Sequence, residues 1–166
     1  MHWRQIREHP SLQDLPFKIE TDRWGHILMS PASNRHSLLQ GELQALLRTL
    51  TPSGAAFPEC SVSTAEGVKV ADVAWASAAF LARHGDADPY PEAPEILIEV
   101  ISPSNSTAEM AEKRALYFAG GALEVWLCDE AGGLRFFDAN GALEHSALVP
   151  TFPAQVRLPF DVRRGS

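Results

Sequence analysis

The run Glu95–Ile101 constrains the fold more than any other part of this 166-residue sequence. Apart from the acids Glu95 and Glu99, every residue in it is leucine, isoleucine or valine. A nearly continuous aliphatic run of this kind is typical of a strand that is buried on both faces of a sheet. Because Ser102-Pro103-Ser104 breaks the pattern directly afterwards, we predict a central strand over Glu95–Ile101.

Hydrophobic patterns on either side of this strand predict the rest of the fold. Leucines that recur every three or four residues indicate a long helix before the central strand. The capping-box pattern of Ser106 followed by Glu109 begins a second helix after it. The predicted elements are, in chain order, a β-hairpin of Phe17–Glu20 and His26–Met29, a helix from Ser33 or Asn34 to about Thr51, strands Phe57–Thr64 and Val68–Trp75, an exposed loop Gly85–Pro94, the central strand, a helix from Ser106 to Gly120, a strand Leu123–Asp129, and a closing hairpin of Leu134–Asp138 and Leu143–Leu148.

This order of elements indicates the fold class. A helix that connects two buried strands, with a long helix before them, is typical of a mixed sheet with helices packed on it. The length suits one core, since a domain typically holds roughly 100 to 200 residues. The composition, 45% hydrophobic and 21% charged, excludes a disordered tail, a collagen-like fibre and a coiled coil. We therefore predict a single α/β or α+β domain over residues 1–166, with an N-terminal β-hairpin.

The charge balance limits the classes of partner. Fourteen Lys and Arg against 21 Asp and Glu give a net charge of -7, which argues against a domain that holds nucleic acid mainly by counterion release. It does not exclude an enzyme that meets phosphates through a divalent metal, because the carboxylates that bind the metal belong to the negative count.

The sequence shows no membrane-spanning stretch, no secretory signal and no cysteine framework, and this predicts the compartment. The uncharged stretch Val73–Ala82 is much shorter than the roughly 20 residues that span a bilayer. The residues Met1–Arg7 lack the apolar core of a secretory signal. Cys60 and Cys128 follow no CxxC spacing and are too few for a disulfide framework or a cysteine-based zinc site. We expect a cytoplasmic protein without a membrane partner, and a homodimer or higher homo-oligomer.

Two acids, Asp72 and Glu99, interrupt predicted apolar strands. Burying an ionised carboxylate without a partner costs several kcal/mol, so each acid needs a donor, a cation or a metal. If the strands are neighbours, the two carboxylates could converge as oxygen ligands for Mg²⁺ or Mn²⁺. Alternatively, one or both point outward to solvent, which the period of two in a strand allows. If they converge, neutralising both should leave the melting temperature unchanged or raise it, because their repulsion is relieved.

Two further side chains have alternative interpretations. Lys113, on the second predicted helix, lies one turn after Glu109 and one turn before Tyr117. It either forms an ordinary surface ion pair with Glu109 or faces the end of the central strand, where its ammonium could hold a water or a phosphate oxygen. His36 shares a helical face with the apolar Leu39. It is either a core-edge histidine bonded to the backbone or a site residue.

Several separate blocks of the sequence carry a resemblance to a known family. The blocks are Trp24–Pro31 followed by Arg35 and His36, Gly67–Ser77, and Pro94–Ser104 followed by Glu112, Lys113, Tyr117 and Glu124–Leu127. Together they resemble the Uma-type putative restriction endonucleases. The similarity runs from about residue 17 to 160 and is specific, because the blocks occur in the right order. That family belongs to the PD-(D/E)XK nuclease superfamily, so the resemblance implies a restriction-endonuclease-like core and Mg²⁺-dependent phosphodiester hydrolysis, with DNA as the expected substrate.

The resemblance also implies roles for individual residues. Asp72 stands at the aspartate of the PD element and Glu99 at the acid of the (D/E)XK element. These two carboxylates, with the backbone carbonyl of Val100, would hold one or two Mg²⁺ or Mn²⁺ ions. The family also has an acid at the position of Glu20 and a histidine at that of His36. Glu20 would complete a second metal position, and His36 would orient a metal ligand.

The sequence departs from the superfamily pattern at two positions. Ala71 stands where the name-giving proline would be, a mild change because that proline mainly shapes the approach to the strand. Ile101, two residues beyond Glu99, stands where the motif has lysine. The resembling family offers a lysine in the following helix instead, here Lys113, which would orient the attacking water or neutralise developing charge.

Two other functions compete with the nuclease. A non-catalytic module could keep the nuclease fold and assemble with itself or with a partner protein. The acidic net charge and the missing strand lysine favour it. The four tryptophans, with Trp126 inside an apolar strand, could mark its interface, although tryptophan is also an ordinary core residue. A hydrolase of small molecules could use the same metal site, and the sequence does not separate it from a nuclease.

Overall fold

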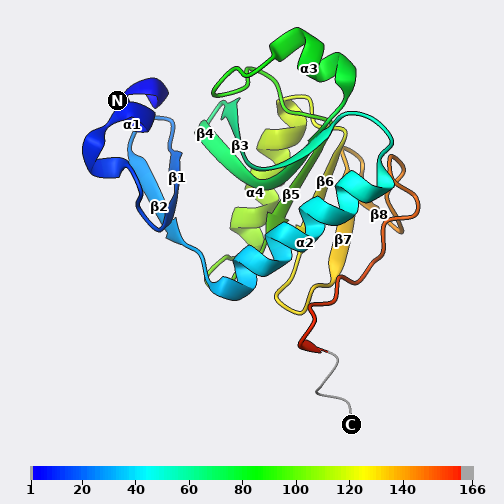
Figure 1. Ribbon diagram of the computed structural model, residues 1–166. Coiled ribbons are helices and arrows are strands. Elements are labelled where there is room, and N and C mark those ends of the chain that lie inside the picture. The colour runs from blue at the N-terminus through cyan, green and yellow to red at the C-terminus, as the bar shows by residue number, and fades with distance from the viewer. Residues whose placement is uncertain (1, 162–166) are drawn as a thin grey trace.

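The computed structural model describes residues 2–161 of the chain (Figure 1). Met1 and residues 162–166 lie outside the described residues, so the two ends of the predicted domain do too. Within residues 2–161, no helix is long and apolar enough to cross a membrane. The elements are α1 (Trp3–Glu8), the short 3₁₀ helix η1 (Pro10–Leu12), β1 (Phe17–Thr21), β2 (Ile27–Pro31), α2 (Asn34–Leu50), β3 (Ala55–Thr64), β4 (Gly67–Ala76), α3 (Ala78–His84), β5 (Ile96–Val100), α4 (Thr107–Ala119), β6 (Glu124–Cys128), β7 (Leu134–Asp138) and β8 (Gly141–Leu143).

The centre of the fold is a six-stranded mixed sheet in the order β3-β4-β5-β6-β7-β8. Within the described residues, the neighbours β5 and β6 are parallel and the other strand pairs of this sheet are antiparallel. Helix α4 is the crossover that connects β5 and β6. Figure 1 shows α2 in front of the sheet, α4 behind it, and the separate β1–β2 hairpin beside it, next to α1. The predicted α+β fold, with a mixed central sheet between helices and an N-terminal hairpin, is confirmed.

The central strand β5 divides the core into two sides. All five of its residues are buried, as the aliphatic run predicts. Ile96 and Ile98 belong to the hydrophobic cluster that includes the buried leucines of α2, whereas Leu97 belongs to the cluster that includes Tyr117 of α4. Because side chains alternate along a strand, Glu99 lies on the same side as Leu97. The carboxylate of Glu99 is thereby directed toward α4.

The β1–β2 hairpin is held against a part of β4 that β5 does not cover. β5 pairs with β4 only over residues 73–75. Nearer the start of β4, the backbone N–H of Val68 donates to Thr21 Oγ1 at 2.8 Å, and that of Val70 donates to Glu20 Oε1 at 2.7 Å. Lys69 Nζ also donates to the carbonyl of Thr21 at 2.9 Å. These bonds bring β1 to the edge of the sheet, beside the end of β5.

The closing hairpin differs from the prediction. The sequence predicts a strand over Leu143–Leu148, but β8 covers only Gly141–Leu143. Asp138 pairs directly with Gly141, so the returning strand begins as soon as a two-residue turn ends. The sequence patterns predict no element over the short helices α1 and α3, so both are additions to the predicted fold.

A buried carboxylate explains why the chain leaves the sheet after β8. Glu124 Oε1 accepts hydrogen bonds from the backbone N–H groups of Ala147 and Leu148, at 2.8 and 2.9 Å. Its Oε2 accepts from Trp126 Nε1 and Ser146 Oγ, both at 2.7 Å. Three of these four donors, from Ser146, Ala147 and Leu148, attach the segment after β8 to the start of β6, so the backbone there bonds to Glu124 instead of to a strand partner.

We expect Glu124→Gln to lower the free energy of unfolding by about 3 kcal/mol, because an amide offers one oxygen where four donors need two. Whichever way the amide turns, its NH₂ group faces buried donors. Urea denaturation followed by fluorescence measures the change. The exposed Glu144→Gln is the matched control and should change the free energy by less than about 0.5 kcal/mol. Equal stabilities for the two variants would contradict this role of Glu124.

Trp126 itself does not mark an interface. Its side chain is fully buried, and its ring packs at 5.0 Å from Phe136 and at 4.7 Å from Phe152, measured between ring centroids. Of the two interpretations of Trp126, the ordinary core residue is confirmed and the interface residue is wrong, because the side chain fills the core on the α2 side of the sheet.

Candidate active site

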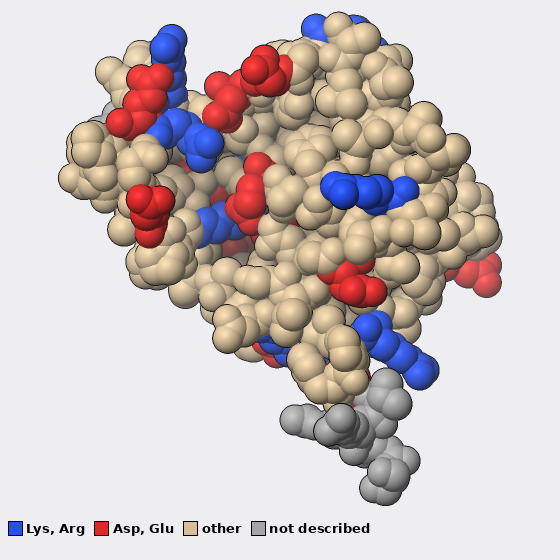
Figure 2. Space-filling view, viewed as in Figure 1, with Lys and Arg blue, Asp and Glu red and all other residues tan. Residues whose placement is uncertain are grey.

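Acidic and basic side chains converge in one open pocket beside the sheet. Its volume is about 590 Å³, and it lies where β1, α2, β4, β5 and α4 meet. Figure 2 shows charged side chains gathered along the hollow between the N-terminal segment and the rest of the molecule. The pocket lining includes all six residues to which the sequence analysis gives a site role, namely Glu20, His36, Asp72, Glu99, Val100 and Lys113.

Asp72 of β4 is buried, with 1% of its surface exposed, so the alternative of an outward-facing side chain is wrong. Its Oδ2 accepts the backbone N–H of Val100 at 2.7 Å, which connects the middle of β4 to the end of β5. Its Oδ1 lies 2.9 Å from Lys18 Nζ and 3.2 Å from His36 Nε2. Burial alone would raise the pKa of Asp72, but Lys18 and His36 outweigh it and hold that pKa well below its usual range. The carboxylate is therefore ionised.

The backbone at Asp72 is fixed from α2. The β3–β4 ladder skips Asp72 and Glu59, and Glu59 has a φ of 55°, which residues other than glycine rarely adopt. Gln40 Nε2 donates to the carbonyl of Asp72 at 2.9 Å and to Glu59 Oε1 at 2.7 Å. Gln40 thus provides a hydrogen bond where the strand pairing is interrupted.

Glu99 of β5 is also buried, with 3% of its surface exposed. Its Oε1 accepts from the hydroxyl of Tyr117 at 2.7 Å and from Lys113 Nζ at 2.9 Å, and its Oε2 lies 3.1 Å from Lys18 Nζ. Burial raises the pKa of Glu99 above its usual value, an effect that Lys113 and Lys18 reduce but do not cancel. Burial and the nearby Glu99 also raise the pKa of Tyr117, so its hydroxyl stays a donor.

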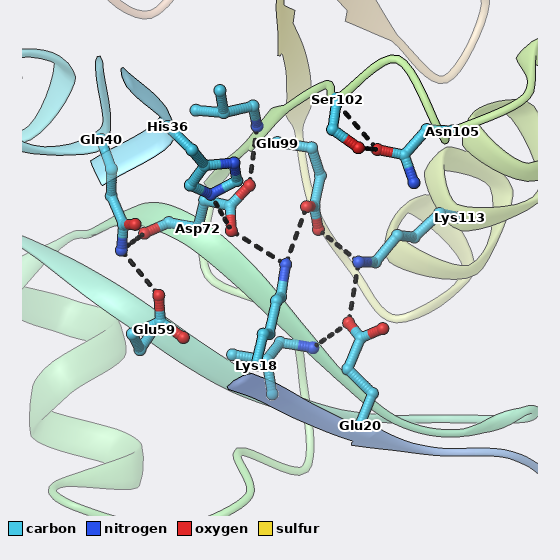
Figure 3. A network of polar contacts seen from close by, with 12 residues as sticks. Lys18, Glu20, His36, Gln40, Glu59, Asp72, Glu99, Ser102, Asn105 and Lys113 are labelled. Atoms are coloured by element: carbon cyan, nitrogen blue, oxygen red, sulfur yellow. Dashed lines mark hydrogen bonds and ion pairs between the residues drawn. The ribbon is translucent and has the colours of Figure 1, made fainter. Parts of the chain in front are cut away.

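Lys113 points from α4 into the pocket. Its Nζ lies 2.7 Å from Glu20 Oε1 and 2.9 Å from Glu99 Oε1, and no ion pair between Lys113 and Glu109 is found within residues 2–161 (Figure 3). Glu109 instead completes the capping box of α4 with Ser106. The surface-pair alternative is therefore wrong. Position 101, two residues after Glu99, is isoleucine, and the ammonium that contacts the Glu99 carboxylate comes from the next helix.

Lys18 of β1 is the site residue that the sequence analysis missed. Its ammonium lies between Asp72 and Glu99, and its side chain is only 13% exposed (Figure 3). Burial lowers the pKa of Lys18, but Glu99 and Asp72 outweigh it, and the pKa lies well above its usual value. One signal was present, because Lys18 precedes Glu20 by two residues on a predicted strand. The period of two places both side chains on one face.

Glu20 and His36 hold the two ends of this network. Glu20 Oε1 accepts the N–H of Val70 and contacts Lys113. Burial would raise the pKa of Glu20, but Lys113 and Lys18 lower it below its usual value. The hydrogen bond to Asp72 raises the pKa of His36. The ring of His36 contacts a carboxylate of the site. The alternative of a core-edge histidine bonded to the backbone is therefore wrong.

The donor set fits a hard divalent cation. Carboxylate oxygens are the ligands that Mg²⁺ and Mn²⁺ prefer, and Mg²⁺ is commonly held by one or two carboxylates together with waters. The ammonium of Lys18 already occupies a cation position between Asp72 and Glu99. Among the described residues, no three acidic, histidine or cysteine side chains form a ready metal site, and the lysines stand between the carboxylates. Asp72 and Glu99 with waters fit the ion, and a preformed cage of protein ligands does not exist there.

Comparison with known proteins assigns the chain to a family. A family model, Uma2, described as a putative restriction endonuclease, matches residues 9–159. The chain belongs to the Uma2 family. Residues 9–159 of this Uma2 protein include every residue of the network described above, so membership supports a nuclease function.

One solved structure shares this fold. The crystal structure of a putative nuclease belonging to DUF820, from Anabaena variabilis ATCC 29413, is similar with a TM-score of 0.62 and 20% sequence identity. The similarity covers 72% of the Uma2 chain and 71% of the Anabaena chain. A search of curated proteins gave no match. The structural likeness establishes a nuclease-like fold, and the chemistry has to be argued from the site.

Proposed function

We propose that this Uma2 protein is a metal-dependent endonuclease that hydrolyses phosphodiester bonds in DNA. The proposal places Mg²⁺ or Mn²⁺ on Asp72 and Glu99. The observation that carries it is the position of Lys113, whose Nζ lies 2.9 Å from Glu99 Oε1 although the motif position itself is Ile101. Two carboxylates and a lysine, the three groups that the family's chemistry needs, thus meet in one pocket.

In the proposed reaction, the metal ligands and Lys113 have different parts. A divalent cation bound at Asp72 and Glu99 would polarise the scissile phosphate and lower the pKa of an attacking water. Lys113 orients that water or neutralises the charge that develops on the phosphate oxygens. The carbonyl oxygen of Val100 is proposed as a further ligand, on the residue whose N–H already holds Asp72.

Three neighbours position these groups. Tyr117 fixes Glu99 by donating to Oε1, and His36 fixes Asp72 by contacting Oδ1. Glu20 holds the ammonium of Lys113 and would complete a second metal position. The hydrogen bonds that orient ligands in this way usually matter nearly as much as the ligands.

We expect cleavage of DNA that requires Mn²⁺ or Mg²⁺ and that EDTA abolishes, because the carboxylates need the cation to activate water. Gel assays on supercoiled plasmid and on single-stranded DNA measure it, with the Glu99→Gln variant as the control for contaminating nucleases. Light scattering on the same preparation tests the expected homodimer.

The same assay separates the competing functions. Metal-dependent hydrolysis of bis(p-nitrophenyl) phosphate without cleavage of any DNA would replace the endonuclease with a hydrolase of small molecules. Absence of both activities in the wild type would favour the assembly module.

A further inference from the structure

Lys18 has no assigned part in this chemistry, although it touches both proposed metal ligands. One oxygen of each carboxylate is bound by the scaffold, Asp72 Oδ2 by the N–H of Val100 and Glu99 Oε1 by the hydroxyl of Tyr117. The other two oxygens, Asp72 Oδ1 and Glu99 Oε2, meet the same ammonium, at 2.9 and 3.1 Å. Figure 3 shows Lys18 reaching up from β1 into the gap between the two acids. Any cation that bridges these oxygens therefore needs the position of Lys18 Nζ.

The charges of the network also indicate that a bound divalent cation replaces one of the two ammonium groups. The network contains three carboxylates and two ammonium groups, an excess of one negative charge when His36 is neutral. A divalent cation added beside both lysines would turn this into an excess of one positive charge in a largely buried site, which is costly. If one ammonium leaves, the carboxylates balance the divalent cation and the remaining lysine.

Of the two lysines, Lys18 is the one that is free to leave. Lys113 contacts only one of the two proposed metal ligands, Glu99, and it keeps Glu20 as a partner when a metal binds Glu99. Both carboxylates that Lys18 contacts are proposed metal ligands. Lys18 lines both the site pocket and an adjoining pocket of about 600 Å³ along the N-terminal segment. A lysine ammonium on its flexible four-carbon stem can turn between two such spaces without any movement of the strand.

We infer that Lys18 is a built-in counter-cation, and that Mg²⁺ or Mn²⁺ binds to Asp72 and Glu99 in exchange for its ammonium. The displaced ammonium turns away from the two carboxylates but stays within the open site pocket, where it can contact a phosphate of the substrate. This inference rests on the metal site of the proposed function. Its consequence is that without metal Lys18 offsets part of the charge of Asp72 and Glu99, which leaves the network with one negative charge in excess, and that metal binding is weaker than two free carboxylates would give.

The direct test is calorimetric titration of the full chain with Mn²⁺. We expect Lys18→Met to bind Mn²⁺ at least about tenfold more tightly than the wild type, because no ammonium competes for the two oxygens. Arg48→Met is the matched control, since it also removes one positive charge but Arg48 is exposed in the last turn of α2 and does not line the site pocket. It should leave the affinity within about twofold of the wild type.

Thermal unfolding provides a second measurement that does not depend on the heats of binding. Without metal, Lys18→Met should melt at a lower temperature than the wild type, because Asp72 and Glu99 then face each other without their shared cation. Mn²⁺ should raise its melting temperature by more than it raises that of the wild type. If the variant folds only when Mn²⁺ is added, the exchange is likewise supported.

Two outcomes overturn the inference, and they differ in what else they remove. If the wild type binds Mn²⁺ and Lys18→Met binds no more tightly and gains no more thermal stability, only the exchange is rejected and the metal site stands. If neither chain binds Mn²⁺, the metal site of the proposed function is rejected together with the exchange.

Discussion

The double variant Asp72→Asn, Glu99→Gln is expected to lose Mn²⁺ binding and to cleave DNA at least about 10³-fold more slowly, a barrier increase of about 4 kcal/mol. Amides keep the shape of both side chains but remove the charges that hold a hard cation. Calorimetry measures the binding, which we expect in the low-millimolar to sub-millimolar range for the wild type, and plasmid nicking measures the rate. Wild-type heats and rates in the variant would reject the metal site.

The structure reverses the expected effect of this variant on stability. From the sequence, two facing carboxylates should repel, and neutralising them should raise the melting temperature or leave it unchanged. Lys18 lies between Asp72 and Glu99, and Lys113 contacts Glu99 as well. The variant therefore leaves two largely buried ammonium groups short of counter-charge, and we expect its melting temperature without metal to fall by about 5 °C or more. The exposed Glu112→Gln should not change it.

Much of the fold was predictable because local sequence signals agree with the tertiary structure. The aliphatic run gave β5, which is buried on both faces, and the caps Ser33 and Ser106 gave the starts of α2 and α4. The end of the sheet was not predictable in the same way. Whether the chain after β8 pairs as a strand depends on the carboxylate of Glu124, which binds Leu148 across 24 residues. No local pattern contains that information.

The candidate site was also predictable only in part. Asp72 and Glu99 could be found because a carboxylate inside an apolar strand needs a partner wherever the strand lies. Lys113 could be placed near them because a helix follows β5 directly and returns along the sheet. Lys18 pairs with Asp72 and Glu99 across 54 and 81 residues, through a hairpin whose docking on β4 depends on hydrogen bonds of Glu20 and Thr21. The sequence shows the hairpin but not the edge of the sheet on which it packs.

Lys113→Met is expected to lower the rate of DNA cleavage by roughly 10²-fold or more, a barrier change of about 3 kcal/mol, because its ammonium would orient the water or neutralise charge on the phosphate. The free energy of unfolding should also fall, by about 2–3 kcal/mol, since Glu20 and Glu99 lose a partner that is only 14% exposed. The rate is therefore compared per folded molecule, at saturating Mn²⁺ and well below the melting temperature.

Two further variants separate the catalytic part of Lys113 from its part in folding. Lys113→Arg keeps the positive charge between Glu20 and Glu99, so it should recover most of the lost stability. It should recover little of the rate, because a guanidinium is larger and directs its donors differently from an ammonium. Glu109→Gln tests the surface-pair alternative and should leave cleavage unchanged, since Glu109 caps α4 and does not contact Lys113. If folded Lys113→Met cleaved DNA at the wild-type rate, Lys113 would be a structural counter-ion only, and the water would have to be oriented by another group.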